Sequence, residues 1–535
     1  MGIQWGLPGE KNYFSLHPDE PVNLLVARNI SVGNGNFDPK FYNYGTLYLT
    51  LLSISNDIAS SSVQGEPGRM EMVGELDRKA LLYGRLINAV SGSICAVFVF
   101  LALRLRTHWG PAAIGGAMLA IAPAFVVHSR FATVDVFATM LLAASQFVAL
   151  RGFSVERSAA DKMKHAALAG ALAGLSAGTK YNGILCLIVL FVIAYDRADL
   201  RTTFRHYGVA ILCSLVAFLI ATPGALLNSA QFMNDFSYEV RHASTGHGLV
   251  FEGIESGFLL HVLYLLLCLG PITFLLSLSG LVTGFVQKNR SVLAVGSFIL
   301  VFYLLIGSAE VLFSRYTFPL YFGLAYGFGW LIHATSQVRI WKHVVAVGTI
   351  LALGGVISGG AVTLSLWTQY MTLPDIRQTA AEFIRADSKS NPEAVVGLVS
   401  DPWFYSPLLY PGVTAPRFVP PQTRDEWMLA AQNPRVTRTL FTEPGQRFDW
   451  DVRLLDQKPL YVTYSSFESI DLHRLSNRTG LKPEVELQVG RYKAFQERLK
   501  SEYRLIFQNH DSLTGVHDLE YIRPMVWIWK RNDAP

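Results

Sequence analysis

The sequence predicts an α-helical polytopic membrane protein of about ten transmembrane helices, followed by a C-terminal α/β domain. Hydrophobic residues make up 51% of the 535 residues and charged residues only 16%, whereas an ordinary soluble domain carries about 25% charge. The apolar residues gather in long stretches, several of which reach the roughly 20 residues that a helix needs to cross a bilayer. Charge and proline become frequent again after residue 366.

Composition also excludes some classes of function. The net charge is only +5, and the basic residues are scattered, so we expect no nucleic-acid partner. The four cysteines all lie in apolar stretches and show neither disulfide nor metal-ligand spacing. Residues 1–20 lack the apolar core of a cleavable signal peptide.

Residues 1–85 form the first predicted region. It holds two adjacent acids, Asp19 and Glu20, between two prolines. Residues 21–58 carry apolar and aromatic stripes, which predict amphipathic helices lying in the membrane interface. Residues 59–73 are rich in Gly, Pro and Ser and predict a polar loop.

Residues 86–366 form the predicted transmembrane domain. Its spans are expected at about 86–103, 110–128, 132–150, 166–179, 183–195, 208–227, 259–286, 291–312, 316–333 and 343–366. Connecting loops that hold several basic residues alternate with loops that hold only one. The richly basic loops hold Arg104, Arg106, Arg151, Arg157, Lys162, Lys164, Arg197, Arg201, Arg205, Lys288, Arg290, Arg339 and Lys342. The positive-inside rule places these loops in the cytoplasm, and therefore residues 1–80 and 367–535 outside.

The loops predicted outside hold few basic residues, and three of these lie at membrane boundaries: Arg130, Lys180 and Arg315. An ionisable residue at this depth is a functional candidate. The structural alternative is a side chain that snorkels to the interface from a helix end.

Residues 367–535 form the predicted extracytoplasmic α/β domain. A helix is expected near 374–386 and another at 489–501, with strands at 394–400, 459–464, 503–507 and 525–530. The domain shows no glycine-rich phosphate loop and no cluster of cysteine and histidine typical of a metal site.

Five motifs follow one another in a fixed order. They are HPDE at 17–20, HSRFATVD at 128–135, AGTKYNG at 177–183, SRYTFPLYF at 314–322 and YMTLPDIRQTAAEFI at 370–384. This order resembles the GT-C superfamily of integral-membrane glycosyltransferases, in particular the branch with protein O-mannosyltransferases and the lipid A aminoarabinose transferase. Family members begin with a transmembrane helix before the acidic pair, and that first helix is missing here.

The resemblance implies transfer of a hexose or pentose from a polyprenyl-phosphate carrier to a hydroxyl acceptor on the outer face, with inversion. It assigns the general base to Asp19, with Glu20 positioning or tuning it, since adjacent carboxylates repel and one pKa rises. The structural alternative is that both acids only begin a helix at Pro21, where negative charge favours the helix dipole.

The resemblance also implies a binding site for the carrier phosphate, formed by Lys180 and Arg315. Asp135 is expected to face the same cavity, where it orients Arg130 or binds sugar or acceptor. The alternative is a structural ion pair.

Five further residues are weaker candidates for binding substrate. They are Tyr181, Tyr316, His17, Tyr42 and Asn43. A divalent metal between Asp19 and Asp135 would have precedent in the superfamily, but we expect no essential metal or other cofactor.

The expected partners are a polyprenyl-phosphate sugar, membrane lipid and an acceptor that is protein, lipid or glycan. The bacterial inner membrane is the expected location. Three other functions stay open: a multi-span transporter or flippase, a glycan polymerase or ligase with a diphosphate donor, and a non-catalytic subunit of an envelope complex. Sugar and acceptor are not identified by the sequence.

Overall fold

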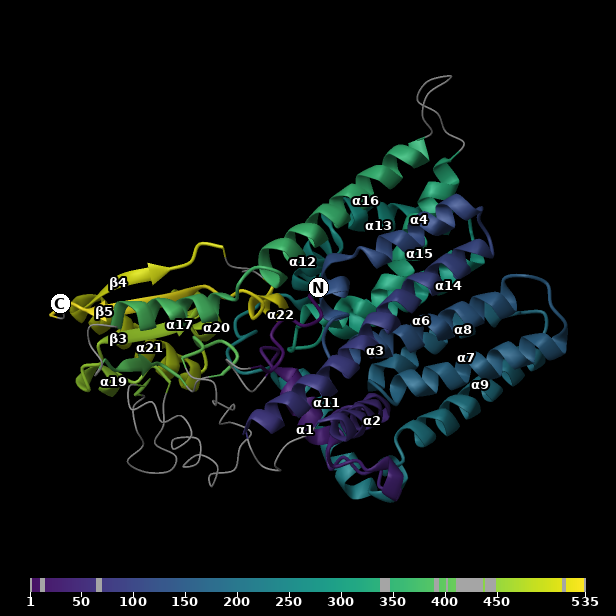
Figure 1. Ribbon diagram of the computed structural model, residues 1–535. Helices are drawn as coiled ribbons and strands as arrows, with labels where there is room; N and C mark the ends of the chain where they lie inside the picture. The colour runs from purple at the N-terminus through teal and green to yellow at the C-terminus, as the bar shows by residue number, and fades with distance from the viewer. Residues whose placement is uncertain are drawn as a thin grey trace.

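The helices of the middle of the chain form a bundle, and a domain with a β-sheet lies at one end of it (Figure 1). We call this the domain-facing end of the bundle. The computed structural model describes residues 2–9, 15–63, 70–336, 347–388, 394–400, 403–409, 436–437, 449–511 and 516–533. The bundle consists of α3 (Met70–Arg104), α4 (Trp109–Ala120), α5 (Pro123–His128), α6 (Val134–Phe153), α7 (Ala159–Ala177), η2 (Tyr181–Cys186), α8 (Leu187–Ala194), α9 (Leu200–Ala221), α12 (Gly257–Leu269), α13 (Pro271–Val286), α14 (Arg290–Gly307), η3 (Ser314–Thr317), α15 (Phe318–Thr335) and α16 (Val347–Leu366).

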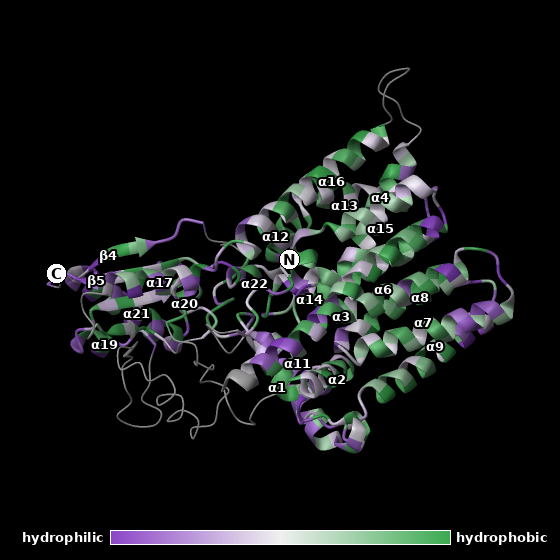
Figure 2. Ribbon diagram, viewed as in Figure 1, coloured by the Kyte–Doolittle hydropathy of each residue, from purple (hydrophilic) through white to green (hydrophobic). Residues whose placement is uncertain are grey.

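The bundle is hydrophobic along most of its length, and hydrophilic residues gather in the loops far from the sheet (Figure 2). Within the described residues, five helices are long and apolar enough to cross a bilayer, or six if α12 and α13 form one broken span. The polytopic helical fold is therefore confirmed. The other expected spans correspond to α4–α5, α7, η2–α8 and α15, which pack in the same bundle.

Two predicted spans are wrong as continuous helices. The expected span 259–286 is two helices that meet at 112°. Gly270 between them has φ 96°, a value that favours glycine, and Pro271 begins α13 without an N–H that needs a partner. The expected span 110–128 breaks in the same way, because α4 ends at Ala120 and Pro123 starts α5.

Helices α7 and α9 approach so closely that glycine is required between them. A Cβ atom added to Gly170 would lie 2.1 Å from the carbonyl oxygen of Ala210, and one added to Gly174 would lie 2.1 Å from that of Ser214. Small residues at such contacts are typical of helix pairs in membranes. This packing fixes the end of α7, directly before Lys180.

The first region of the chain lies against the domain-facing half of the bundle (Figure 1). The predicted helices are confirmed only in part, because the chain from Arg28 to Thr46 is mostly irregular. The predicted loop 59–73 is shorter than expected: helix continues to Ser62 and resumes at Met70, while residues 64–69 lie outside the described part. The elements near this end are α1 (Asp19–Ala27), η1 (Val32–Asn34), α2 (Leu47–Ser62), α10 (Gly224–Leu227) and α11 (Ser229–Thr245).

The C-terminal domain contains a mixed sheet with strand order β2-β1-β3-β5-β4. Strand β1 runs parallel to β2 and β3, and β5 runs antiparallel to β3 and β4. All four predicted strands and both predicted helices are present. The elements are η4 (Trp367–Met371), α17 (Ile376–Asp387), β1 (Val396–Leu398), β2 (Val436–Thr437), α19 (Arg453–Asp456), β3 (Tyr461–Ser465), α20 (Ser466–Leu475), α21 (Pro483–Glu502), β4 (Tyr503–Gln508), α22 (His517–Glu520) and β5 (Val526–Arg531).

The C-terminal domain is held on the bundle by aromatic rings and by Arg474, and Arg377 fixes Tyr521 within the domain. The Tyr521 ring lies 4.8 Å from that of His17 and 5.9 Å from that of Phe131, between centroids. Arg377 is fully buried and donates to the carbonyl oxygen of Tyr521 at 2.9 Å. Arg474 on α20 donates to three carbonyl oxygens of residues 249–252. These contacts fix α22 beside η3.

Candidate active site

Asp19 is the first residue of α1, and its carboxylate faces the centre of the domain-facing end. Its backbone N–H donates to His17 Nδ1 at 3.1 Å. One carboxylate oxygen lies 3.2 Å from Arg315 Nη2, and the side chain remains 34% exposed. Asp19 is therefore an accessible acid with one ion-pair partner within the described residues.

Glu20 points to a different place. Arg85 on α3 binds its carboxylate through two hydrogen bonds of 2.7 Å, the Ala132 N–H donates a third at 2.7 Å, and the Ser15 hydroxyl donates a fourth. Both charged side chains are fully buried. Burial alone would raise the pKa of Glu20, but the Arg85 guanidinium holds this pKa below its usual value.

The Glu20–Arg85 pair acts on the site through the backbone. Arg85 also donates to the carbonyl oxygens of Ile3 and Trp5 at 2.7 Å each. The pair thus ties the N-terminal segment and the loop before α6 to α3. Tuning of Asp19 by Glu20 stays a prediction. The Arg85 guanidinium already neutralises the charge of Glu20.

Asp135 and Lys180 come from two helix ends that meet. Asp135 lies in the first turn of α6, and Lys180 follows the end of α7. Lys180 Nζ lies 2.5 Å from one oxygen of Asp135, and Arg315 Nε lies 3.7 Å from the other. Lys180 also lies over the Tyr316 ring, 4.3 Å from its centroid. The predicted convergence of Asp135, Lys180 and Arg315 is present.

Arg315, in η3, is the centre of the cluster. Besides Asp19 and Asp135 it contacts a third acid, Asp518 of α22, at 3.5 Å from Nη1. Its guanidinium also lies over the Phe313 ring, 4.1 Å from the centroid. Asp518 was missed by the sequence analysis, because no motif surrounds it and it lies about two hundred positions after Arg315.

The space among these side chains is small in the described structure. Two polar cavities of about 20 Å³ and 10 Å³ adjoin the cluster, and Asp135, Lys180, Arg315 and Tyr316 line both. Such volumes hold about one water each. A ligand larger than a water molecule would therefore fit only if these side chains moved apart.

The other predicted site residues surround the cluster. Tyr181 donates to the carbonyl oxygens of Tyr42 and Tyr44, at 2.6 and 3.1 Å. Tyr42 donates to Asp38 at 2.8 Å and Asn43 hydrogen-bonds Glu239. Tyr181, Tyr42 and Asn43 thus shape the loop that places Tyr44 in the polar cavity.

His17 and Arg130 lie on the side of the cluster toward the C-terminal domain. His17 is fully buried, and burial lowers its pKa. Its ring is therefore neutral and accepts the Asp19 N–H through Nδ1. Arg130 Nη1 lies 3.6 Å from Met371 Sδ. Asp135, which was expected to orient Arg130 or to bind sugar or acceptor, pairs with Lys180 and Arg315.

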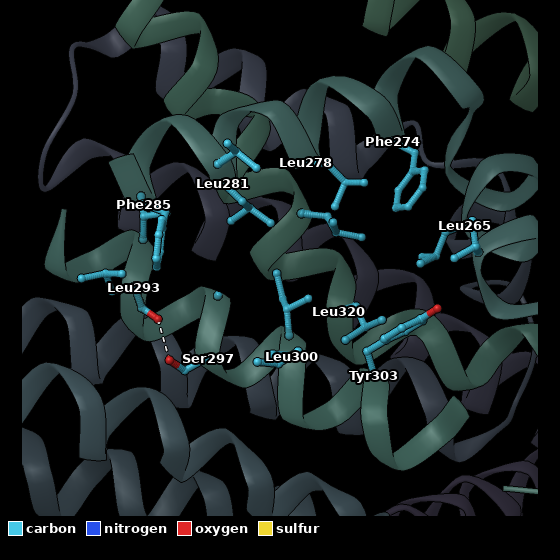
Figure 3. A pocket seen from close by; sticks show the side chains of 16 residues that line it. Leu265, Phe274, Leu278, Leu281, Phe285, Leu293, Ser297, Leu300, Tyr303 and Leu320 are labelled. Carbon is cyan, nitrogen blue, oxygen red and sulfur yellow. Dashed lines mark hydrogen bonds between the residues drawn. The ribbon is translucent and has the colours of Figure 1, made fainter. Parts of the chain in front are cut away.

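An apolar cavity of about 510 Å³ lies among α12, α13, α14 and α15. Figure 3 shows Phe285 and Leu293 at one end of it and Leu265 and Tyr303 at the other. Several lining side chains are largely exposed on the bundle surface, Phe285 by 66%. Leu320 lines this cavity and follows Pro319, which lines the polar cavity near Arg315. Neighbouring residues of α15 thus line the two cavities, and the apolar one is a groove open to the bundle surface.

The carboxylates do not fit a divalent metal. Arg315 lies between Asp19 and Asp135, and Lys180 already pairs with Asp135. Within the described residues, no group of three or more His, Cys, Asp or Glu side chains is arranged to hold a metal ion. A metal cation between these carboxylates would lie against the Arg315 guanidinium, which repels it.

Comparisons with known proteins identify the fold. Residues 72–224 match the family model of dolichyl-phosphate-mannose-protein mannosyltransferases. The structure is similar to ArnT from Cupriavidus metallidurans bound to undecaprenyl phosphate, with a TM-score of 0.53 and 15% identity over 98% of this chain and 94% of that one. The chain has the fold of the GT-C superfamily.

A second GT-C structure is also similar. The oligosaccharyltransferase of Archaeoglobus fulgidus in the apo form gives a TM-score of 0.52 and 12% identity, covering 93% of this chain and 76% of that one. No curated protein matches the sequence. The segment that matches the family model includes Arg85, Asp135 and Lys180 but neither Asp19 nor Arg315.

Proposed function

We propose that this GT-C protein transfers a sugar from a polyprenyl-phosphate carrier to a hydroxyl acceptor. The observation that carries the proposal is the accessible carboxylate of Asp19 beside two partly buried cations, Lys180 and Arg315, in one polar site. A carboxylate can take the proton of an acceptor hydroxyl, and a cation pair can stabilise the charge of a departing phosphate.

Each charged side chain has a role in this reaction. Asp19 is the general base. Arg315 and Lys180 bind the phosphate, which Arg can do through two parallel hydrogen bonds. Asp135 positions both cations until the phosphate arrives. The hydroxyl oxygen attacks the anomeric carbon, the bond from that carbon to the phosphate oxygen breaks, and the leaving group departs as polyprenyl phosphate. One displacement inverts the anomeric configuration.

The apolar groove supports a lipid-linked donor. A groove lined mostly by leucine, valine and phenylalanine and open to the bundle surface fits a prenyl chain. The solved ArnT structure contains undecaprenyl phosphate, and the matching family is described by a dolichyl-phosphate sugar. Polyprenyl phosphate is the chemistry that these names share. Hexose and pentose donors, and protein, lipid and glycan acceptors, all remain candidates.

The distribution of charge supports an orientation with the site on the outer face. Loops rich in arginine and lysine meet at the end of the bundle far from the sheet, where Arg290 donates to the carbonyl oxygen of Ile193 at 3.2 Å. The positive-inside rule places that end in the cytoplasm and the C-terminal domain outside. The bacterial inner membrane is the location that we propose.

The test uses membranes with this protein and a radiolabelled polyprenyl-phosphate hexose, with release or transfer of label as the readout. Wild type is compared with Asp19→Asn and with Asp57→Asn, which makes the same change at an exposed acid of α2. We expect turnover by wild type and Asp57→Asn, and loss in Asp19→Asn at equal protein level.

Three results would contradict this proposal. Equal turnover in Asp19→Asn would remove Asp19 from the chemistry. Absence of turnover in wild type across several hexoses and pentoses would favour a transporter or a non-catalytic subunit, and turnover of a diphosphate-linked donor alone would favour a glycan polymerase or ligase.

A further inference from the structure

Asp518 in the C-terminal domain makes contacts that a surface acid does not make. Its side chain is completely buried. One carboxylate oxygen accepts the N–H of Ser314 at 3.2 Å, and the other accepts the N–H of Arg315 at 3.0 Å. The second oxygen also lies 3.5 Å from Arg315 Nη1. Asp518 therefore holds both the backbone and the side chain of the central arginine.

The position of Asp518 is itself fixed by domain docking. The neighbouring His517 ring packs at 5.8 Å from that of Phe313 and at 5.0 Å from that of Phe467 on α20. Tyr521, three residues later, packs on His17 and receives a hydrogen bond from Arg377. A carboxylate anchored on both sides can hold η3 in one place.

We propose that Asp518 is a positioning residue that keeps Arg315 ready for the carrier phosphate, so that the C-terminal domain completes the active site. This inference rests on the proposed function. The domain then does more than cover the site or recruit an acceptor: it supplies one of the three carboxylates that surround Arg315.

The distances explain why a third carboxylate is needed. Arg315 lies 3.2 Å from Asp19 and 3.7 Å from Asp135, so both pairs have room to shorten. Without the bonds from Asp518 to the η3 backbone, the guanidinium would move onto these two acids. It would then be withdrawn from the phosphate, and Asp19 would be neutralised as a base. Asp518 prevents this movement chiefly through its two backbone bonds.

The kinetic test compares wild type, Asp518→Ala and Asp511→Asn with the radiolabelled donor. Asp511 lies in the same domain and binds the Arg523 guanidinium at 2.6 Å, as a matched carboxylate–arginine pair. We expect Asp518→Ala to lower kcat/KM by about 10- to 100-fold, mostly in kcat, and Asp511→Asn to match wild type. Equal losses in both variants would indicate a general effect on the domain and overturn the proposal.

A double variant tests whether Asp518 acts through Arg315. If it does, Asp518→Ala added to Arg315→Ala causes little further loss, because the side chain that Asp518 positions is already absent. Multiplied losses would mean that Asp518 acts elsewhere and would contradict the proposal.

Binding of undecaprenyl phosphate in nanodiscs gives a readout that does not depend on turnover. We expect Asp518→Ala to bind about tenfold more weakly than wild type, with Asp511→Asn unchanged. Tighter binding would show that Asp518 repels the phosphate rather than positioning Arg315. If wild type shows no transfer but this difference in binding is present, the proposed reaction fails and the role of Asp518 in phosphate binding stands. If binding is also equal, both fail.

Discussion

The Glu20–Arg85 pair and the cluster around Arg315 are two regions of buried charge that begin one residue apart on α1. Glu20 receives four hydrogen bonds and is inaccessible. Asp19 has one contact with a guanidinium, at 3.2 Å, and is one-third exposed. A carboxylate with every oxygen satisfied can hold structure but has no lone pair free for a substrate proton. The difference indicates that stability and chemistry are divided between two adjacent acids.

The largest expected contrast is between Asp19→Asn and Glu20→Gln. The first should lower turnover by about 10²- to 10⁴-fold and leave the melting temperature unchanged, because its carboxylate carries little of the packing. Glu20→Gln should lower the melting temperature, because it removes the buried ion pair with Arg85. Turnover and thermal unfolding measured on the same preparations distinguish them. An equal fall in melting temperature in both variants would contradict the assignment of stability to Glu20 and chemistry to Asp19.

The second contrast removes the other partner of the Glu20–Arg85 pair. Arg85→Leu leaves the Glu20 carboxylate buried without its cation, which typically costs about 3–5 kcal/mol. We expect a large fall in folded protein, partly restored in the double variant Glu20→Gln with Arg85→Leu. The amount of monodisperse protein extracted from membranes measures this. Normal yield of Arg85→Leu would show that the pair is dispensable.

A carboxylate of α20, Glu468, extends the comparison to pH. Burial raises the pKa of Glu468 from 4.5 to about 7, although Ser465 and Ser400 donate to it. Between these two pH values the folded domain keeps a proton that the unfolded chain has lost. Unfolding therefore becomes easier as pH rises from 4.5 to about 7, by about 3 kcal/mol in total.

Glu468→Gln retains an acceptor for Ser465 and a donor for Ser400, and it cannot ionise. We expect this variant to lose the difference in stability between pH 4.5 and 7 that wild type shows. Thermal unfolding in nanodiscs across this pH range tests it. Parallel curves for the two proteins would contradict the assignment of this pH dependence to Glu468.

The smallest expected effect concerns metal. Because protein cations already neutralise Asp19 and Asp135, chelation with EDTA should change turnover by less than about twofold. The control is the same assay with added Mg²⁺ or Mn²⁺. A large loss of turnover on chelation, restored by either ion, would show that the site rearranges to bind metal. The charges of Asp19 and Asp135 would then be neutralised by a metal ion and not by protein cations alone.

Hydropathy predicted the bundle because its helices are apolar along most of their length. The α12–α13 bend was missed since hydropathy continues through it, yet Gly270 and Pro271 together are a turn signal. The convergence of Asp135, Lys180 and Arg315 followed from motif order and shared sidedness. The partners Arg85 and Asp518 were not predictable, because each meets its acid or arginine only through tertiary packing over long stretches of chain.

The groove that opens on the side of the bundle has a consequence for how a substrate is encountered. A lipid that enters between α13 and α14 arrives by diffusion in two dimensions, already oriented by the bilayer. Its effective concentration is then its mole fraction among membrane lipids, and bulk volume is irrelevant. Diluting the membrane with inert phospholipid would lower the concentration of the lipid that the protein meets, whereas diluting the whole suspension with buffer would leave it unchanged.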